Sequence, residues 1–225
     1  MTQHETERIT ARVEYAKLGR LRFIGHLDTT RLITRAVRMA RLPVRYTQGC
    51  SPHLEVSFGP PLAVGCTGGS EFFDLKLSES VDPDAARDAL QAHVPDGIQV
   101  RSVRLTTGRT ESLGASINRA DYVIELGSDL APDTAQRFLD ESEVIVTRHR
   151  DDREKPVNVR RFVERLAIAE RENGTRVEMT IIVTPEGSTN PAEVLEALGI
   201  DPNAATRIHR TRTYHAADTD QASGA

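Results

Sequence analysis

Apolar side chains recur at helical spacing over residues 29–41, and runs with strand-like alternation stand before and after them. The helical spacing predicts an amphipathic helix with one buried face. Asp28 or Thr29 can cap its first turn, and Pro43 ends its last. The apolar stripe of this helix consists of Leu32, Ile33, Ala36, Val37 and Ala40.

Two further helices are marked by a capping residue that is followed by proline. Asp82 and Pro83 predict the start of one helix, and Asn190 and Pro191 predict the start of another. Glu193 stands three positions after Asn190, where it completes a capping box. A helix is also expected over residues 132–141, and strands over residues 11–16, 21–24, 44–47, 54–58, 71–77, 98–105, 122–126, 143–149, 165–170, 176–183 and 206–214.

These elements give the order β, α, β, β, α, β in the first half, and the second half runs through a similar order. We therefore expect an α+β protein made of two tandem ferredoxin-like halves with antiparallel sheets. The glycine-rich residues 65–70 precede a strand and no helix, so they predict a turn and no nucleotide site. The expected division is a disordered N-terminus at 1–10, a first half at 11–106, a linker at 107–119, a second half at 120–215 and a disordered tail at 216–225.

The net charge of -4 conceals a basic segment near the N-terminus, where arginines far outnumber Glu14 and Asp28. Arg31, Arg35 and Arg38 lie at i, i+4 and i+7, so they share one face of the first helix. This charge predicts a site for phosphates or for an acidic partner, although exposed helix faces are also often arginine-rich without a ligand. The residues assigned to an anion or RNA site are Arg20, Arg22, Arg31, Arg35, Arg38, Arg41, Arg45, Tyr46, Gln48 and His53.

Two other kinds of chemistry are weaker alternatives. His26 and Asp28 are the types of a catalytic dyad, and His26, Cys50, His53 and Cys66 are types that zinc or iron accepts. Their spacing matches no known zinc pattern. The plainer interpretation is that His26 and Asp28 cap a helix and that both cysteines pack as small apolar groups. We therefore expect no metal and no cofactor.

A long run of the chain carries a family resemblance. The strings are LRFIGHLDTTRLITRAVRMARLPVRYTQGCSPHLEVSFGPPLAVGCTGGSEFFDLKL and, more loosely, EKPVNVRRFVERL, GSTNPAEVLEALGI and RIHRTRTY. In these strings the sequence resembles the radical-SAM-linked protein family. Members of that family occur alone or attached to the C-terminal side of cobalamin-binding and radical SAM modules, so the resemblance implies a radical SAM enzyme as partner.

The chain is not expected to be the radical enzyme itself. Such an enzyme holds its iron–sulfur cluster with three closely spaced cysteines, and this sequence has only Cys50 and Cys66. We expect a non-catalytic, cytoplasmic accessory protein without a membrane span, because no long apolar run or signal peptide is present. We expect it to act with a radical SAM enzyme and to present either tRNA-like RNA or an acidic partner through the basic helix. The alternatives are a protein-interaction or regulatory subunit without nucleic acid and an independent metal- or His/Asp-dependent enzyme.

Overall fold

A computed structural model describes residues 8–150, 153–184 and 186–215 of the chain, apart from the side chains of residues 150 and 153. The chain divides into two compact units, Met1–Ile117 and Asn118–Ala225, each with its own hydrophobic core. Both units are mixed α+β with mainly antiparallel strands, as the sequence predicts. The expected disorder of residues 1–10 and 216–225 lies largely outside the described residues.

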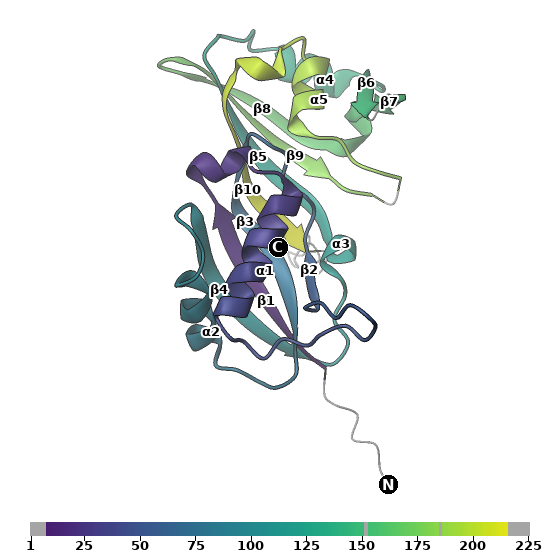
Figure 1. Ribbon diagram of the computed structural model, residues 1–225. Coiled ribbons are helices and arrows are strands. Elements are labelled where there is room, and N and C mark those ends of the chain that lie inside the picture. Colours follow the sequence, from purple (N-terminus) through teal and green to yellow (C-terminus); the bar gives the residue numbers. More distant parts are fainter. Residues whose placement is uncertain (1–7, 151–152, 185, 216–225) are drawn as a thin grey trace, which may run out of the picture. The chain divides into compact units, whose positions relative to one another are not determined.

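The first unit is an antiparallel sheet with α1 and α2 on one face (Figure 1). The first strand, β1, lies between β4 and β3, and β2 pairs with the other side of β3. The elements of this unit are β1 Ile9–Lys17, the 3-10 turn η1 Gly19–Phe23, α1 His26–Met39, β2 Val56–Phe58, β3 Cys66–Leu77, α2 Pro83–Gln91, β4 Ile98–Thr107 and the short helix α3 Leu113–Ser116.

The two faces of this sheet have opposite character because side chains alternate along each strand. One face is apolar, and α1 and α2 cover it with buried residues such as Ile33 and Leu90. The polar face carries the pairs of β1 and β3 that lie directly opposite each other in register, Arg12 with Asp74 and Thr10 with Lys76. The apolar stripe of α1 is thereby confirmed: Ile33, Ala36 and Val37 are buried, and Leu32 and Ala40 pack against the same core.

The second unit repeats the strand order of the first. Its first strand, β5, lies between the last strand β10 and the third main strand β9, and β8 pairs with the other side of β9. A separate hairpin of β6 and β7 follows α4. The elements are β5 Ile117–Leu126, α4 Thr134–Asp140, β6 Ile145–Arg150, β7 Arg153–Asn158, the 3-10 turn η2 Val159–Phe162, β8 Val163–Arg171, β9 Gly174–Ile182, α5 Pro191–Ala197, the 3-10 turn η3 Pro202–Ala204 and β10 Ala205–His215.

The start of α5 is fixed by a network around Glu193. Asn190 and Glu193 form the predicted capping box, and Glu193 is 6% exposed. Arg148 of β6 donates from Nη2 to Glu193 Oε2 at 2.7 Å, and Thr189 donates to the same oxygen at 2.8 Å. Burial by itself raises the pKa of Glu193, but these hydrogen bonds and the charge of Arg148 outweigh it, so the pKa lies lower than its ordinary value.

Several expected boundaries were wrong. Residues 66–70 are not a turn but the first part of β3, and the Glu71 carboxylate occupies the space that a Cβ at Gly68 would need. Residues 44–47 form only isolated bridges, and residues 21–24 lie in and after η1. The expected linker is shortened, because β5 already begins at Ile117.

The ends of the first unit also differ from expectation. Strand β1 begins at Ile9, so residues 9 and 10 do not belong to a disordered terminus. Helix α1 begins at His26 after Gly25, and Asp28 therefore stands inside the first turn instead of capping it. The run 143–149 corresponds to β6, which pairs with β7 and takes no place in the main sheet.

Within the described residues, none of the helices is both long enough and apolar enough to cross a membrane.

Candidate nucleic-acid interface

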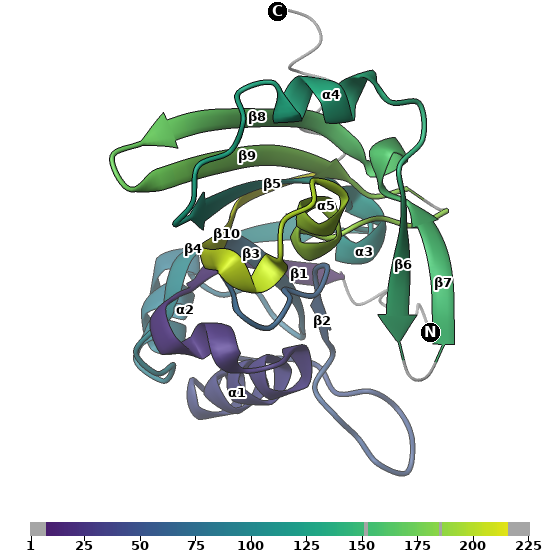
Figure 2. The same ribbon diagram turned by 90° about the horizontal axis from the view of Figure 1, so that it is seen from above.

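Helix α1 separates apolar from basic residues on opposite faces. Arg31, Arg35 and Arg38 are exposed, whereas Ile33 and Val37 are buried against the sheet. Figure 2, viewed from above, shows α1 along the outside of the first unit, below its strands. The helix therefore holds three guanidinium groups in solvent while its other face is committed to the core.

Most of this charge has no acidic partner. Arg31 Nη1 lies 3.2 Å from Asp28 Oδ1, but both side chains are largely exposed, and an exposed i, i+3 pair holds its partner weakly. Among the described residues, neither Arg35 nor Arg38 forms an ion pair. The helix face can therefore receive an anion without first breaking a strong contact.

Three more arginines lie at the two ends of α1. Arg20 and Arg22 belong to η1, immediately before the helix, and the Arg22 guanidinium lies 4.7 Å from the centre of the Phe23 ring. Arg41 follows the helix with a left-handed φ of 53°. None of the three has an acidic partner in the described part of the chain. We call the arginines of this segment the basic surface; Arg22 is half-buried and the others are exposed: Arg20, Arg22, Arg31, Arg35, Arg38 and Arg41.

Arg45 and the polar loop after it have partners of their own, unlike most arginines of the basic surface. Arg45 Nε lies 3.4 Å from Glu55 Oε2, so its charge is partly compensated. The loop of residues 47–53 is closed at its base, where Thr47 Oγ1 bonds both the Nδ1 and the backbone N of His53. Tyr46 and Gln48 are exposed at this loop. Tyr46 and His53, the residues predicted to stack on bases, are accessible to solvent. The hydrogen bonds of His53 to Thr47 serve to close the loop.

The two candidate catalytic residues are not brought together. His26 packs edge-on against Phe58, with ring centres 5.9 Å apart, and Asp28 points to Arg31. Within the described residues no hydrogen bond joins His26 and Asp28, and apart from Arg31 neither pairs with another charged side chain. Next to His26 the enclosed space amounts to about 10 Å³, which is room for roughly one water.

The candidate metal ligands are also dispersed. Cys50 is exposed in the polar loop, Cys66 is buried at the start of β3, and His53 is bonded to Thr47. Over residues 8–150, 153–184 and 186–215, no three His, Cys, Asp or Glu side chains converge as a metal site would require.

Two features of the first unit were missed from the sequence. The first is a cleft of about 280 Å³ lined by Arg8, Lys76 and Arg109, which are distant in sequence and meet only through strand pairing. The second is a group of large apolar side chains in solvent, where Phe23 is 61%, Leu27 70% and Val64 63% exposed. The sequence did contain a signal for this second feature, because these apolar residues lie outside the buried stripe of the basic helix.

Comparisons with known proteins place the chain in a family without an assigned activity. A family model described as "uncharacterized protein conserved in bacteria (DUF2344)" matches residues 10–191. No curated protein matches the chain.

Solved structures resemble the chain only loosely. A chain in the crystal structure of a Cbf5-Nop10-Gar1 complex is 12% identical, with a TM-score of 0.47 over 90% of this chain and 48% of that one. A chain in the archaeal box H/ACA sRNP Nop10-Cbf5 complex is 11% identical, with a TM-score of 0.44 over 91% and 48%. This chain thus spans about half the length of both. At such low values the likeness says nothing about what the chain binds.

Proposed function

Because the chain belongs to DUF2344, a family of uncharacterized proteins conserved in bacteria, we propose its function from its own basic surface: it is a non-catalytic accessory protein that binds tRNA-like RNA. The observation that supports this proposal is the absence of acidic partners for Arg20, Arg22, Arg35, Arg38 and Arg41 in the described residues. The phosphates of RNA would supply the negative charge that these arginines lack, and phosphate contacts give most of the affinity of a protein for RNA.

The geometry of the basic surface favours contacts with the RNA backbone over recognition of the RNA bases. Arg31, Arg35 and Arg38 follow one face of a helix of fourteen residues, Met39 being its last. Guanidinium groups spaced along one helix face suit a row of phosphates. Tyr46 and His53 stand apart on the polar loop, and with only 4% aromatic residues the chain has little to stack on bases. We therefore expect RNA binding with modest sequence preference.

We also propose the ferredoxin-like fold for both units. Each has the element order β, α, β, β, α, β around a sheet in which the first main strand lies between the fourth and the third. The second unit adds the β6–β7 hairpin after α4. In this arrangement the helices occupy one face of each sheet, which is why α1 presents its outer face to solvent.

The test is a pair of charge reversals with a matched control. R35E/R38E should weaken binding of a tRNA transcript at least about tenfold, because two phosphate contacts become repulsive. The control is R101E/R104E on β4, which changes the net charge equally and also involves exposed arginines without acidic partners in the described residues. Equal loss of binding in both variants, or in neither, would contradict the basic surface as the RNA site.

A second function, docking to a protein, is favoured by the apolar side chains that border the basic surface. The backbone N of Gly65 donates to the Arg22 carbonyl at 2.7 Å, which brings the Val64 segment beside Phe23 and the start of α1. Exposed aromatic and aliphatic residues rimmed by arginine are typical of protein interfaces. The family resemblance gives a radical SAM enzyme as the partner, and Arg20 and Arg22 would face acidic groups on it.

This second function is separable from RNA binding. Phe23→Ser with Leu27→Ser should abolish co-elution with a co-expressed radical SAM enzyme of the same organism and leave the RNA affinity unchanged. The control is Ile145→Ser, which removes an apolar side chain from β6 that is 51% exposed, against 61% for Phe23 and 70% for Leu27. Co-elution that survives the double substitution would exclude this surface as the docking site.

A further inference from the structure

The cleft of the first unit is bordered by an excess of positive charge. It measures about 280 Å³ and is lined by Arg8, Arg45, Lys76, Arg109, Glu55 and Thr110. Backbone hydrogen bonds connect the segments that form its walls: Gly108 N donates to Arg8 O at 2.9 Å, and Arg45 N donates to Lys76 O at 2.7 Å. The basic residues thus come from separate segments that are held in fixed positions around one opening.

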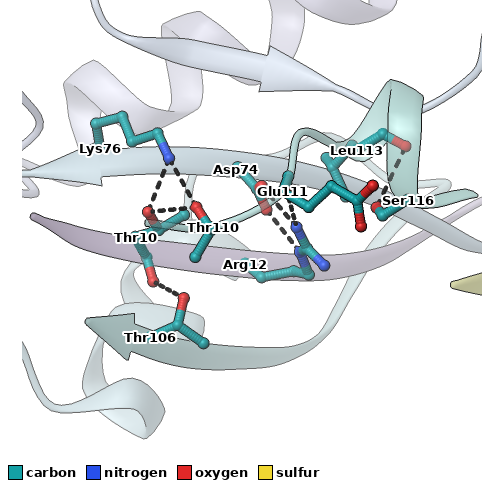
Figure 3. A network of polar contacts seen from close by, with 9 residues as sticks. All are labelled: Thr10, Arg12, Asp74, Lys76, Thr106, Thr110, Glu111, Leu113 and Ser116. Carbon is teal, nitrogen blue, oxygen red and sulfur yellow. Dashed lines mark hydrogen bonds and ion pairs between the residues drawn. The ribbon is translucent and has the colours of Figure 1, made fainter. Parts of the chain in front are cut away.

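Lys76 is the group that most needs explanation, and a comparison with Arg12 shows why (Figure 3). Arg12 donates through Nε and Nη2 to the two carboxylate oxygens of Asp74, both at 2.9 Å, so its charge is matched. Lys76 lies on the same sheet face but donates to two neutral hydroxyls, Thr10 at 2.8 Å and Thr110 at 3.1 Å. An ammonium group has three donors, so one N–H and the full charge of Lys76 stay without an anion in the described structure.

The other basic residues add to this excess. Arg45 shares Glu55, the single acid among the lining residues. Arg8 and Arg109 are exposed and form no ion pair within the described residues. Arg8, Lys76 and Arg109 therefore leave three positive charges at the cleft. A ligand with two negative charges would offset most of this excess, and guanidinium forks bind phosphate oxygens in pairs.

We infer that this cleft binds a phosphate monoester. Its volume lies near the lower end of the range for small-ligand sites, so it accommodates a phosphate with an attached sugar or nucleoside and no larger body. The phosphate could belong to a free nucleotide or to the end of an RNA chain. The inference does not depend on RNA binding by α1, because none of the basic-surface residues lines the cleft.

The first experiment is calorimetric titration of the full chain with AMP, and with adenosine as the uncharged reference. AMP should bind and adenosine should not. Lys76→Met should weaken AMP binding at least about tenfold, since a hydrogen bond to a charged group is lost. The matched control, Lys155→Met on the exposed face of β7, removes the same charge from the second unit and should bind AMP like the wild type.

Further arms identify the source of the phosphate and keep the test decisive. A 5′-phosphorylated oligoribonucleotide that binds at least about tenfold more tightly than its 5′-hydroxyl form, a difference lost in Lys76→Met, would identify a chain end. Equal binding of the two oligonucleotides together with AMP binding would identify a free nucleotide. If Lys76→Met fails to fold, Arg109→Ala against Arg104→Ala takes its place.

The phosphate-binding inference and the proposed RNA-binding function can be tested independently of each other. R35E/R38E should lose RNA and still bind AMP with unchanged affinity. The inference is overturned if AMP binds no better than adenosine and the two oligonucleotides bind alike, or if Lys76→Met and Arg109→Ala both bind phosphate like the wild type.

Discussion

The two units use arginine differently although their strands follow the same order. In the second unit, seven of the described arginines lie within 4 Å of an acid, for example Arg148 with Glu193 and Arg119 with Glu164. The further ion-paired arginines of that unit are Arg137, Arg165, Arg171, Arg176 and Arg207. In the basic surface of the first unit, only Arg31 has such a partner among the described residues.

The difference teaches which charges the fold itself uses. A paired arginine that also contacts backbone, such as Arg148 on Ser188 O at 2.8 Å, contributes to folding. An exposed arginine without a partner contributes little to the free energy of unfolding. Among the described residues, the charge of α1 has no acidic partner besides Asp28, and this is why we propose a ligand for it.

The largest effect is expected where a buried carboxylate is removed. Asp74 is 2% exposed and holds Arg12 through two hydrogen bonds. Asp74→Ala should lower the free energy of unfolding by about 2–3 kcal/mol, because the half-buried guanidinium loses its counter-charge. Chemical denaturation measures this loss, and Asp74→Asn, which keeps a hydrogen-bond acceptor, should lose less. If the denaturation midpoint of Asp74→Ala equalled that of the wild type, an ion pair within the fold would not mark an arginine as structural.

A smaller loss is expected at the corresponding contact of the second unit. Glu193→Ala removes both the capping box of α5 and the partner of Arg148. We expect about 1–2 kcal/mol less stability, within the range for loss of a cap, because the Arg148 side chain is 34% exposed and partly screened. Glu193→Gln should retain part of the cap. Denaturation followed by circular dichroism gives the values, and equal stability of all three proteins would refute the structural role.

Acidic pH should reproduce part of that loss. The pKa of Glu193 lies below its ordinary value of 4.5 in the folded state, so the unfolded state binds the proton more readily. Its contribution is complete above that ordinary value and is lost as pH falls through the lower folded-state pKa. The melting temperature of the wild type should therefore fall more steeply than that of Glu193→Gln below about pH 4.5. Parallel curves would show that Glu193 is not linked to stability.

The smallest effect is expected in the basic surface. R35E/R38E should change the free energy of unfolding by no more than about 0.5 kcal/mol, because both side chains are exposed and neither has a partner to lose in the described structure. A loss similar to that of Asp74→Ala would mean that these arginines are structural after all.

The sequence predicted best the elements whose signals are local. Helix α2 begins after its Asp82 cap, α5 begins with its capping box, and the buried stripe of α1 was correct, because caps and helical spacing involve residues within a few positions. The turn predicted over residues 65–70 is present only at Gly65, and for residues 66–70 it was wrong for a physical reason. Gly68 lies in the strand beside the Glu71 carboxylate, so close packing and not chain reversal requires glycine there.

The candidate site was predictable only as far as it lies on one helix. Arg31, Arg35 and Arg38 share a face because of their spacing, whereas Arg8, Lys76 and Arg109 meet through pairing of β1 with β3 and with β4. Such register depends on residues far apart in the chain. The pairing of Arg45 with Glu55 likewise follows from the fold and reduces a charge that the sequence presented as free.

The most direct test of the account is the salt dependence of RNA affinity in the wild type and in R35A/R38A. If about four arginines contact phosphates at about 0.7 released ions each, log affinity should fall with log salt at a slope of about -3, and the double substitution should make it less steep by about 1.5. R101A/R104A should keep the wild-type slope. A wild-type slope near zero, or one that R35A/R38A leaves unchanged, would contradict the proposal that the basic surface of α1 binds RNA.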